Sequence, residues 1–112
     1  MVKQIEFIKR KQGLSQQEFS RHYEEVFAPL MLRASPTIKR YVRNHVIRTI
    51  AGGEANIDCV TELWFENMEG LEANIKVFMS DKGKVIRDSL KEFVDNSRTV
   101  VLIVDERVSS LP

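Results

Sequence analysis

The spacing of the apolar residues constrains the fold of this chain most strongly. They recur every two residues in some segments, as in strands, and every three or four residues in others, as in helices. Residues 2–9 alternate in the manner of a strand. Ser15 and Glu18 then form a capping box, in which each side chain binds the other residue's backbone N–H, and this predicts the start of a helix. The helical period continues to Leu30, and Pro29 predicts a kink or an end of the helix near it, because proline has no backbone N–H.

The rest of the chain predicts three further strands and two further helices. These elements are a strand over 37–50, a loop over 51–56, a strand over 57–66, a helix capped by Asn67, a short helix at a different angle from Ser80 onward, and a strand over 99–106. The resulting order is typical of a split βαβ pair, an α+β ferredoxin-like fold with a four-stranded antiparallel sheet and helices on one face. Because the other face has no cover within the chain, we expect a second copy to bury it in a homodimer.

Length and composition narrow the domain organisation and the partners. The 112 residues suit a single domain over 1–112, and 43% hydrophobic with 29% charged residues indicates a packed core. A net charge of +1 gives no field that would attract nucleic acid or anionic membrane, so we expect neither as a partner. Without a signal-peptide pattern or a long apolar run, and with Cys59 as the one cysteine, we expect a cytoplasmic protein.

Several ordered segments resemble the EthD family of small dimeric α+β barrel proteins. They are VKQIEFIKRKQGLSQQEF at 2–19, YEEVFAPL at 23–30, IKRYVRNHV at 38–46, TELWFENMEGLEA at 61–73, MSDKGKV at 79–85 and EFVDN at 92–96. The family includes proteins of ether-degradation clusters, dehydratases or cyclases of aromatic polyketides, and muconolactone isomerases. The resemblance therefore implies a dimeric barrel and cofactor-independent isomerase, dehydratase or cyclase chemistry on a small aromatic or polyketide-like substrate.

One departure from the family pattern leaves an alternative function open. Many relatives carry a histidine just before the Ala-Pro pair of the first helix, and this chain has Phe27 there. The alternative is a non-catalytic small-molecule-binding or accessory protein of a degradation or biosynthetic pathway.

The two histidines are the predicted catalytic residues, because imidazole accepts and returns protons near neutral pH. His45 follows Tyr41 on one face of the second predicted strand, and a hydrogen bond within the sheet or at the dimer interface is its structural alternative. His22 lies on the apolar face of the first helix, where it either acts in catalysis or is a satisfied core residue. We expect one histidine, His45, to be essential and the other to be structural.

Six side chains are predicted to bind the substrate or to wall its pocket. They are Tyr23, Phe27, Tyr41, Asn44, Asp58 and Trp64. Tyr23 could orient a carbonyl or simply pack, and Asp58 beside a histidine would raise its basicity or else lie on the surface. No metal-ligand spacing or haem-attachment motif occurs, so we expect neither metal nor cofactor, although some barrels of this architecture bind haem through a histidine.

Overall fold

The computed structural model describes residues 1–52 and 57–112, so part of the predicted loop over 51–56 lies outside the described residues. Its four strands form one antiparallel sheet in the order β2-β3-β1-β4. The strands are β1 (Val2–Ile8), β2 (Ile38–His45), β3 (Cys59–Phe65) and β4 (Val100–Val104). The predicted α+β class and its order of elements are confirmed.

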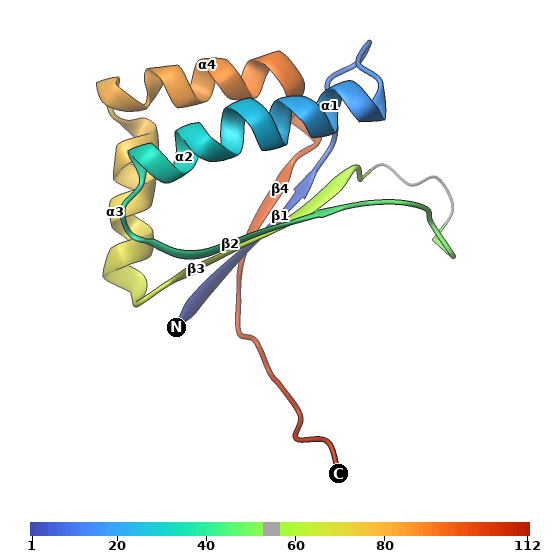
Figure 1. The fold of residues 1–112 in the computed structure, drawn as a ribbon. Coiled ribbons are helices and arrows are strands. Elements are labelled where there is room, and N and C mark those ends of the chain that lie inside the picture. Colours follow the sequence, from blue (N-terminus) through green and yellow to red (C-terminus); the bar gives the residue numbers. More distant parts are fainter. Residues whose placement is uncertain (53–56) are drawn as a thin grey trace.

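The helices all lie on one face of this sheet (Figure 1). They are α1 (Gln16–His22), the π-helical segment η1 (Tyr23–Phe27), α2 (Ala28–Ala34), α3 (Met68–Met79) and α4 (Lys84–Phe93), with 3₁₀ turns η2 (Asp81–Gly83) and η3 (Asn96–Arg98). No helix in the described part of the chain is long and apolar enough to span a membrane.

The first helix starts as the sequence predicts and passes Pro29 without ending. Ser15 accepts the backbone N–H of Glu18, and the Glu18 carboxylate accepts that of Ser15, each at 3.0 Å. One turn before Pro29 the chain widens into η1, where the backbone N–H of Ala28 donates to the carbonyl of Tyr23. A widened turn is a common device where the regular hydrogen-bond ladder is interrupted, and here it carries the helix on to Ala34.

The second strand is shorter than predicted and changes phase at its start. β2 ends at His45 rather than Ile50, because its partner strand begins only at Cys59, which lies opposite His45. A register shift between Ile38 and Arg40 also places Ile38 against the core, on the same side as Tyr41. The strand predicted over 37–50 therefore begins one residue later, and the bulge after Ile38 interrupts the alternation of its side chains.

The second and third long helices meet at a close approach that requires glycine. Asn67 caps α3 by accepting the backbone N–H of Gly70 at 2.9 Å. At the junction with α4, a Cβ on Gly83 would collide with the carbonyl oxygens of Val77 and Phe78. A glycine there lets α4 turn back at a new angle, as the sequence predicts and Figure 1 shows.

Aromatic side chains fill the space between the helices and the sheet. Phe19, Tyr23, Phe65 and Phe93 have no exposed surface, and the rings of Phe19 and Phe93 lie 5.4 Å apart. Full burial of such a side chain stabilises a fold by about 2–3 kcal/mol. The core thus fixes the first helix and α4 above the centre of the sheet.

Candidate functional site

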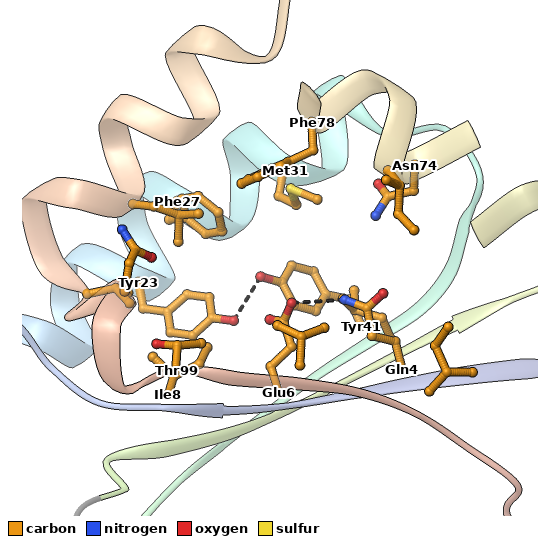
Figure 2. A pocket seen from close by; sticks show the side chains of 17 residues that line it. Gln4, Glu6, Ile8, Tyr23, Phe27, Met31, Tyr41, Asn74, Phe78 and Thr99 are labelled. Atoms are coloured by element: carbon orange, nitrogen blue, oxygen red, sulfur yellow. Dashed lines mark hydrogen bonds between the residues drawn. The ribbon is translucent and has the colours of Figure 1, made fainter. Parts of the chain in front are cut away.

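A cavity of about 340 Å³ lies between the sheet and the helices. Figure 2 shows Gln4, Glu6, Ile8 and Thr99 along the sheet, facing Phe27, Met31 and Phe78 from the helices above them. The alternation of strand side chains places every second residue of β1 on this face. The cavity volume lies at the small end of the range typical of ligand pockets.

The cavity opens along β4 and α3. Val101 and Ile103 of β4 and Ile75 of α3 line it, and each is about half exposed, at 54%, 53% and 46%. Phe27 and Leu63 also line it but are only 5% and 2% exposed. A molecule entering past the β4 rim would therefore pass from half-solvated apolar side chains to a closed interior.

Glu6 is the one charged side chain among the described residues that line the cavity. It lies in the middle of β1, opposite Thr61 of β3 and Val101 of β4, and its Oε2 accepts a 2.9 Å hydrogen bond from the amide of Gln4. Desolvation among the apolar walls raises the pKa of the Glu6 carboxyl to about 7, although the hydrogen bond from Gln4 favours the ionised form. Glu6 is thus able to take up and release a proton near neutral pH.

A chain of hydroxyl groups lies on the same wall as Glu6. The Tyr41 hydroxyl donates to that of Tyr23 at 3.0 Å, and the Tyr23 hydroxyl is bonded to Thr61 Oγ1 at 2.6 Å (Figure 2 draws the tyrosine pair). Burial raises the pKa values of both tyrosines well above the usual range, so both stay protonated at neutral pH. Because hydroxyl protons rotate, this chain is able to present either a donor or an acceptor to a bound oxygen.

A buried amide adds a second polar point on the helix side of the cavity. Asn74 of α3 is 5% exposed and lines the cavity, and the hydroxyl of Ser35 donates to its Oδ1. Because this contact engages Oδ1, the amide nitrogen is the group of Asn74 that can donate to a ligand. The polar groups thus converge from two sides, with Glu6 and Tyr41 on the sheet and Asn74 opposite them.

The structure places neither histidine on this cavity. The imidazole of His45 contacts Ser20 Oγ through Nδ1 at 3.2 Å and Glu24 Oε2 through Nε2 at 2.7 Å. Arg43 also binds Glu24, with Nη2 to Oε1 at 2.7 Å, and these contacts, that of Arg43 foremost, lower the pKa of Glu24 to about 2. His45 therefore belongs to an ion-pair cluster that joins β2 to η1.

His22 lies on the opposite side of the first helix, against α4. Its ring stacks on Phe93 with centroids 4.7 Å apart, and its Nε2 lies 3.4 Å from Ser89 Oγ and 3.8 Å from Glu92 Oε2. The side chain is about one fifth exposed rather than fully buried. Packing and hydrogen bonds account for its position.

Of the predicted substrate-binding residues, Tyr23, Phe27 and Tyr41 line the cavity, and the other three do not. Asn44 lies on the open face of the sheet, where its amide donates to the Val60 carbonyl at 2.8 Å. Trp64 is on that same face, and Lys3 Nζ lies 4.5 Å from the centre of its ring. These two side chains do not reach the cavity, because the alternation of side chains along β2 and β3 points them away from the helices.

Asp58 precedes β3, and its carboxylate binds the basic residues that follow β1. Its carboxylate accepts the backbone N–H of Arg10 at 2.8 Å and lies 3.3 Å from Lys9 Nζ. The carboxylate that contacts His45 is that of Glu24, which the sequence did not single out. Among the described residues, no three His, Cys, Asp or Glu side chains gather as a metal-binding group.

Glu6 is the cavity carboxylate that sequence reasoning missed. The alternation in β1 already put Glu6 on one face with Gln4 and Ile8, opposite Ile5 and Phe7. What could have drawn attention to it is a carboxylate at mid-strand on the face that the helices must cover. Because Lys3 and Lys9 are also charged, Glu6 looked like one more polar residue of an ordinary alternating strand.

The comparisons with known proteins agree with this architecture. The family model described as the EthD domain matches residues 11–97. An ethyl tert-butyl ether D family protein from Bacillus halodurans is 19% identical with a TM-score of 0.69, and the match covers 96% of this chain and 100% of that one. No curated protein matches the sequence.

Two further solved structures share the fold. A protein from Bacteroides fragilis, described as dimeric with a ferredoxin-like fold, is 12% identical with a TM-score of 0.64, over 94% of this chain and 95% of that one. A cofactor-independent oxygenase from Streptomyces nogalater is 8% identical with a TM-score of 0.61, over 96% and 94%. At these identities the structural matches establish the fold alone.

Proposed function

This chain belongs to the EthD family, and we propose that it is a cofactor-independent isomerase, dehydratase or cyclase of a small aromatic or polyketide-like molecule. One observation carries the proposal: the Glu6 carboxyl lies in an apolar cavity beside a chain of tyrosine hydroxyls, where desolvation raises its pKa to about 7. General acid–base catalysis needs a group that is poised near the operating pH, and Glu6 has this property.

In the proposed reaction Glu6 moves a proton next to a carbonyl group. The Glu6 carboxylate removes a proton from the carbon beside the carbonyl, and the electrons of the broken C–H bond form the C=C bond of an enol or enolate. The protonated Glu6 then returns this proton to another carbon, which completes an isomerisation, or to a departing hydroxyl, which leaves as water. Both outcomes conserve electrons, so the step needs no oxidant or reductant.

The tyrosine hydroxyls would stabilise the oxygen on which charge develops. In the structure Tyr41 donates to Tyr23; when a substrate binds, rotation of the hydroxyl protons so that Thr61 donates to Tyr23 and Tyr23 to Tyr41 would direct the Tyr41 proton to the substrate oxygen. A hydroxyl donor in a cavity of low polarity stabilises a developing oxyanion more strongly than it would in water. Tyr41 is therefore proposed as the group that binds the carbonyl oxygen.

This proposal assigns proton transfer to Glu6 instead of the histidines. The imidazoles of His45 and His22 are engaged with Glu24 and Ser89, outside the residues that line the cavity. A general base must come within hydrogen-bond reach of the proton that it abstracts. Glu6 meets that condition for a molecule in the cavity.

Hydrogen–deuterium exchange tests the proposal without knowledge of the natural substrate. In D₂O, NMR would follow exchange of the α-protons of small aryl ketones such as 2-acetylnaphthalene and 1-tetralone. We expect the wild-type protein to accelerate exchange and Glu6→Gln to slow it by roughly 100-fold. Glu72→Gln, which makes the same charge change at an exposed site on α3, should exchange like the wild type. Wild-type exchange rates in Glu6→Gln would refute the assignment.

A non-catalytic binding protein is the second candidate. It is favoured by Phe27, which lines the cavity where many relatives carry a histidine. This candidate predicts that the ketones bind and that the wild-type protein does not accelerate their exchange. The exchange experiment therefore separates the two functions.

We also propose that the protein acts as a homodimer formed through the open face of the sheet. Val100 and Leu102 on this face are 48% and 43% exposed. On the same face Lys3 Nζ forms ion pairs with Glu62 at 2.7 Å and with Glu106 at 2.6 Å. These pairs lower the cost of burying the lysine charge in an interface. The dimeric Bacteroides fragilis protein of the same fold supports this arrangement.

The cytoplasm is the proposed compartment. Cys59 is a free, buried thiol, and burial raises its pKa to about 11, so that it stays in the unreactive protonated form. A reducing compartment is compatible with such a residue.

A further inference from the structure

We propose that the cavity selects uncharged ligands and rejects organic anions such as carboxylates. This inference rests on the proposed function only in taking the cavity as the ligand site. It concerns binding, and it narrows the ligand class to neutral molecules with polar groups at two ends.

The charges around the cavity support this selection. Among the residues that the structure describes, no lysine, arginine or histidine lines it, and Glu6 is the one carboxylic acid in its lining. Arg43 stacks on the ring of Tyr41 at 4.7 Å, but Glu24 already neutralises its guanidinium. A carboxylate ligand would therefore lose its hydration and find no counter-ion.

The second reason is repulsion from Glu6 itself. When Glu6 is ionised, a second negative charge in the same small apolar space is strongly disfavoured, because charges interact more strongly there than in water. The titratable groups that line the cavity with Glu6 are Tyr23 from η1 and Tyr41 from β2, and both stay neutral. None of the residues that β4, α3 and α4 contribute to the cavity is titratable.

The polar groups that remain fit a neutral molecule with two oxygen or nitrogen functions. Tyr41 and the Gln4–Glu6 pair meet one end, and the amide of Asn74 meets the other from the helix side (Figure 2). The walls between them are apolar, which suits a flat ring system. Phenols, ketones and amides have this character, whereas ring carboxylic acids at neutral pH do not.

A pair of probes of nearly the same shape tests the inference. Isothermal titration at pH 8 would compare 2-naphthamide with 2-naphthoate, which differ chiefly in charge. We expect the wild-type protein to bind the amide at least about 10-fold more tightly than the carboxylate. Glu6→Gln should bring the ratio of the two affinities closer to one at pH 8, since it removes the negative charge that repels the carboxylate. Glu72→Gln should leave this ratio unchanged. Wild-type protein at pH 6, where Glu6 is largely protonated, should resemble Glu6→Gln.

Equal or tighter binding of 2-naphthoate by the wild-type protein would overturn the inference, as would failure of both probes to bind. A ratio that stayed the same in Glu6→Gln and at pH 6 would remove Glu6 as its cause and overturn the charge argument. These outcomes are separate from those of the exchange experiment. Glu6→Gln with full exchange activity would end the catalytic proposal while leaving the measured selectivity intact.

Discussion

The hydroxyl groups of Tyr41 and Tyr23 lie 3.0 Å apart in the wall of the cavity, but their surroundings are unequal. Tyr23 is fully buried and is bonded to Thr61 as well, whereas Tyr41 is held by this one side-chain contact of its hydroxyl and can form a further hydrogen bond with a ligand. The first is placed to support the fold and the second to meet a substrate.

Replacement of these tyrosines by phenylalanine should therefore have different effects. Tyr23→Phe removes the hydroxyl that is bonded to both Thr61 and Tyr41 and leaves Thr61 Oγ1 only a 3.7 Å contact with Cys59 Sγ, so we expect it to lower the free energy of unfolding by about 1–3 kcal/mol. Tyr41→Phe should cost about 1 kcal/mol or less but slow α-proton exchange at least about 10-fold. Urea unfolding and the exchange assay would measure both. Equal losses of stability with unchanged exchange would contradict the division of roles.

Glu6 makes stability depend on pH in a defined direction. Its pKa of about 7 in the folded protein exceeds the ordinary value of 4.5, so between these values the folded state binds more protons than the unfolded state. Stability contributed by Glu6 is thus complete below about pH 4.5 and is lost as the pH rises through 7. Relative to the wild type, Glu6→Gln should gain about 3 kcal/mol between pH 4 and pH 8, measured by urea unfolding. A difference that did not change with pH would show that the carboxyl is not desolvated.

The sequence predicted the fold well because its local signals agree with one another. The capping box at Ser15, the cap at Asn67 and the alternation in β1 and β3 all survive in the structure. The errors in the second predicted strand occurred where contacts between distant segments decide how far and in which register a strand pairs. Residues 46–50 have strand-forming composition but pair with no strand in the part of the chain that the structure describes, and the bulge after Ile38 depends on pairing with β3.

The site was predicted only in part, because side-chain type is a weaker guide than the face a side chain occupies. Tyr23, Phe27 and Tyr41 do line the cavity, since their spacing put them on faces that point inward, while their role in binding stays a prediction. The histidines attracted attention through their chemistry, yet nearby Glu24 and Ser89 hold them elsewhere. Which carboxylates are paired and which are desolvated depends on contacts between distant segments, and the sequence does not reveal these.

His45 provides a test between the two catalytic hypotheses. Because its Nε2 binds Glu24 at 2.7 Å on a partly exposed surface, His45→Ala should cost about 1 kcal/mol of stability and leave exchange within about threefold of the wild type. Catalysis by His45, the hypothesis from the sequence, predicts a loss of about 100-fold instead. A loss of that size with unchanged ligand binding would return the proton-transfer role to this histidine.

The proposed dimer makes a prediction for the open face of the sheet. Light scattering at micromolar concentration should give a mass near twice that of the 13.0 kDa chain. Leu102→Asp, which puts a charge on the face, should produce monomers, whereas Leu111→Asp in the exposed C-terminal segment should remain dimeric. A monomeric wild-type protein would refute the interface.

The ionisation of Glu6 tests the central claim most directly, because both the proposed catalysis and the ligand selection depend on it. With ¹³C-labelled glutamate, NMR would follow the carboxyl signals of the protein from pH 3 to pH 9, and Glu6→Gln would identify the Glu6 signal by its absence. A carboxyl in the desolvated cavity should titrate with a midpoint near 7. A midpoint near the ordinary value of 4.5 would contradict the account, because Glu6 would then be a solvated carboxylate with no special capacity to return a proton at neutral pH.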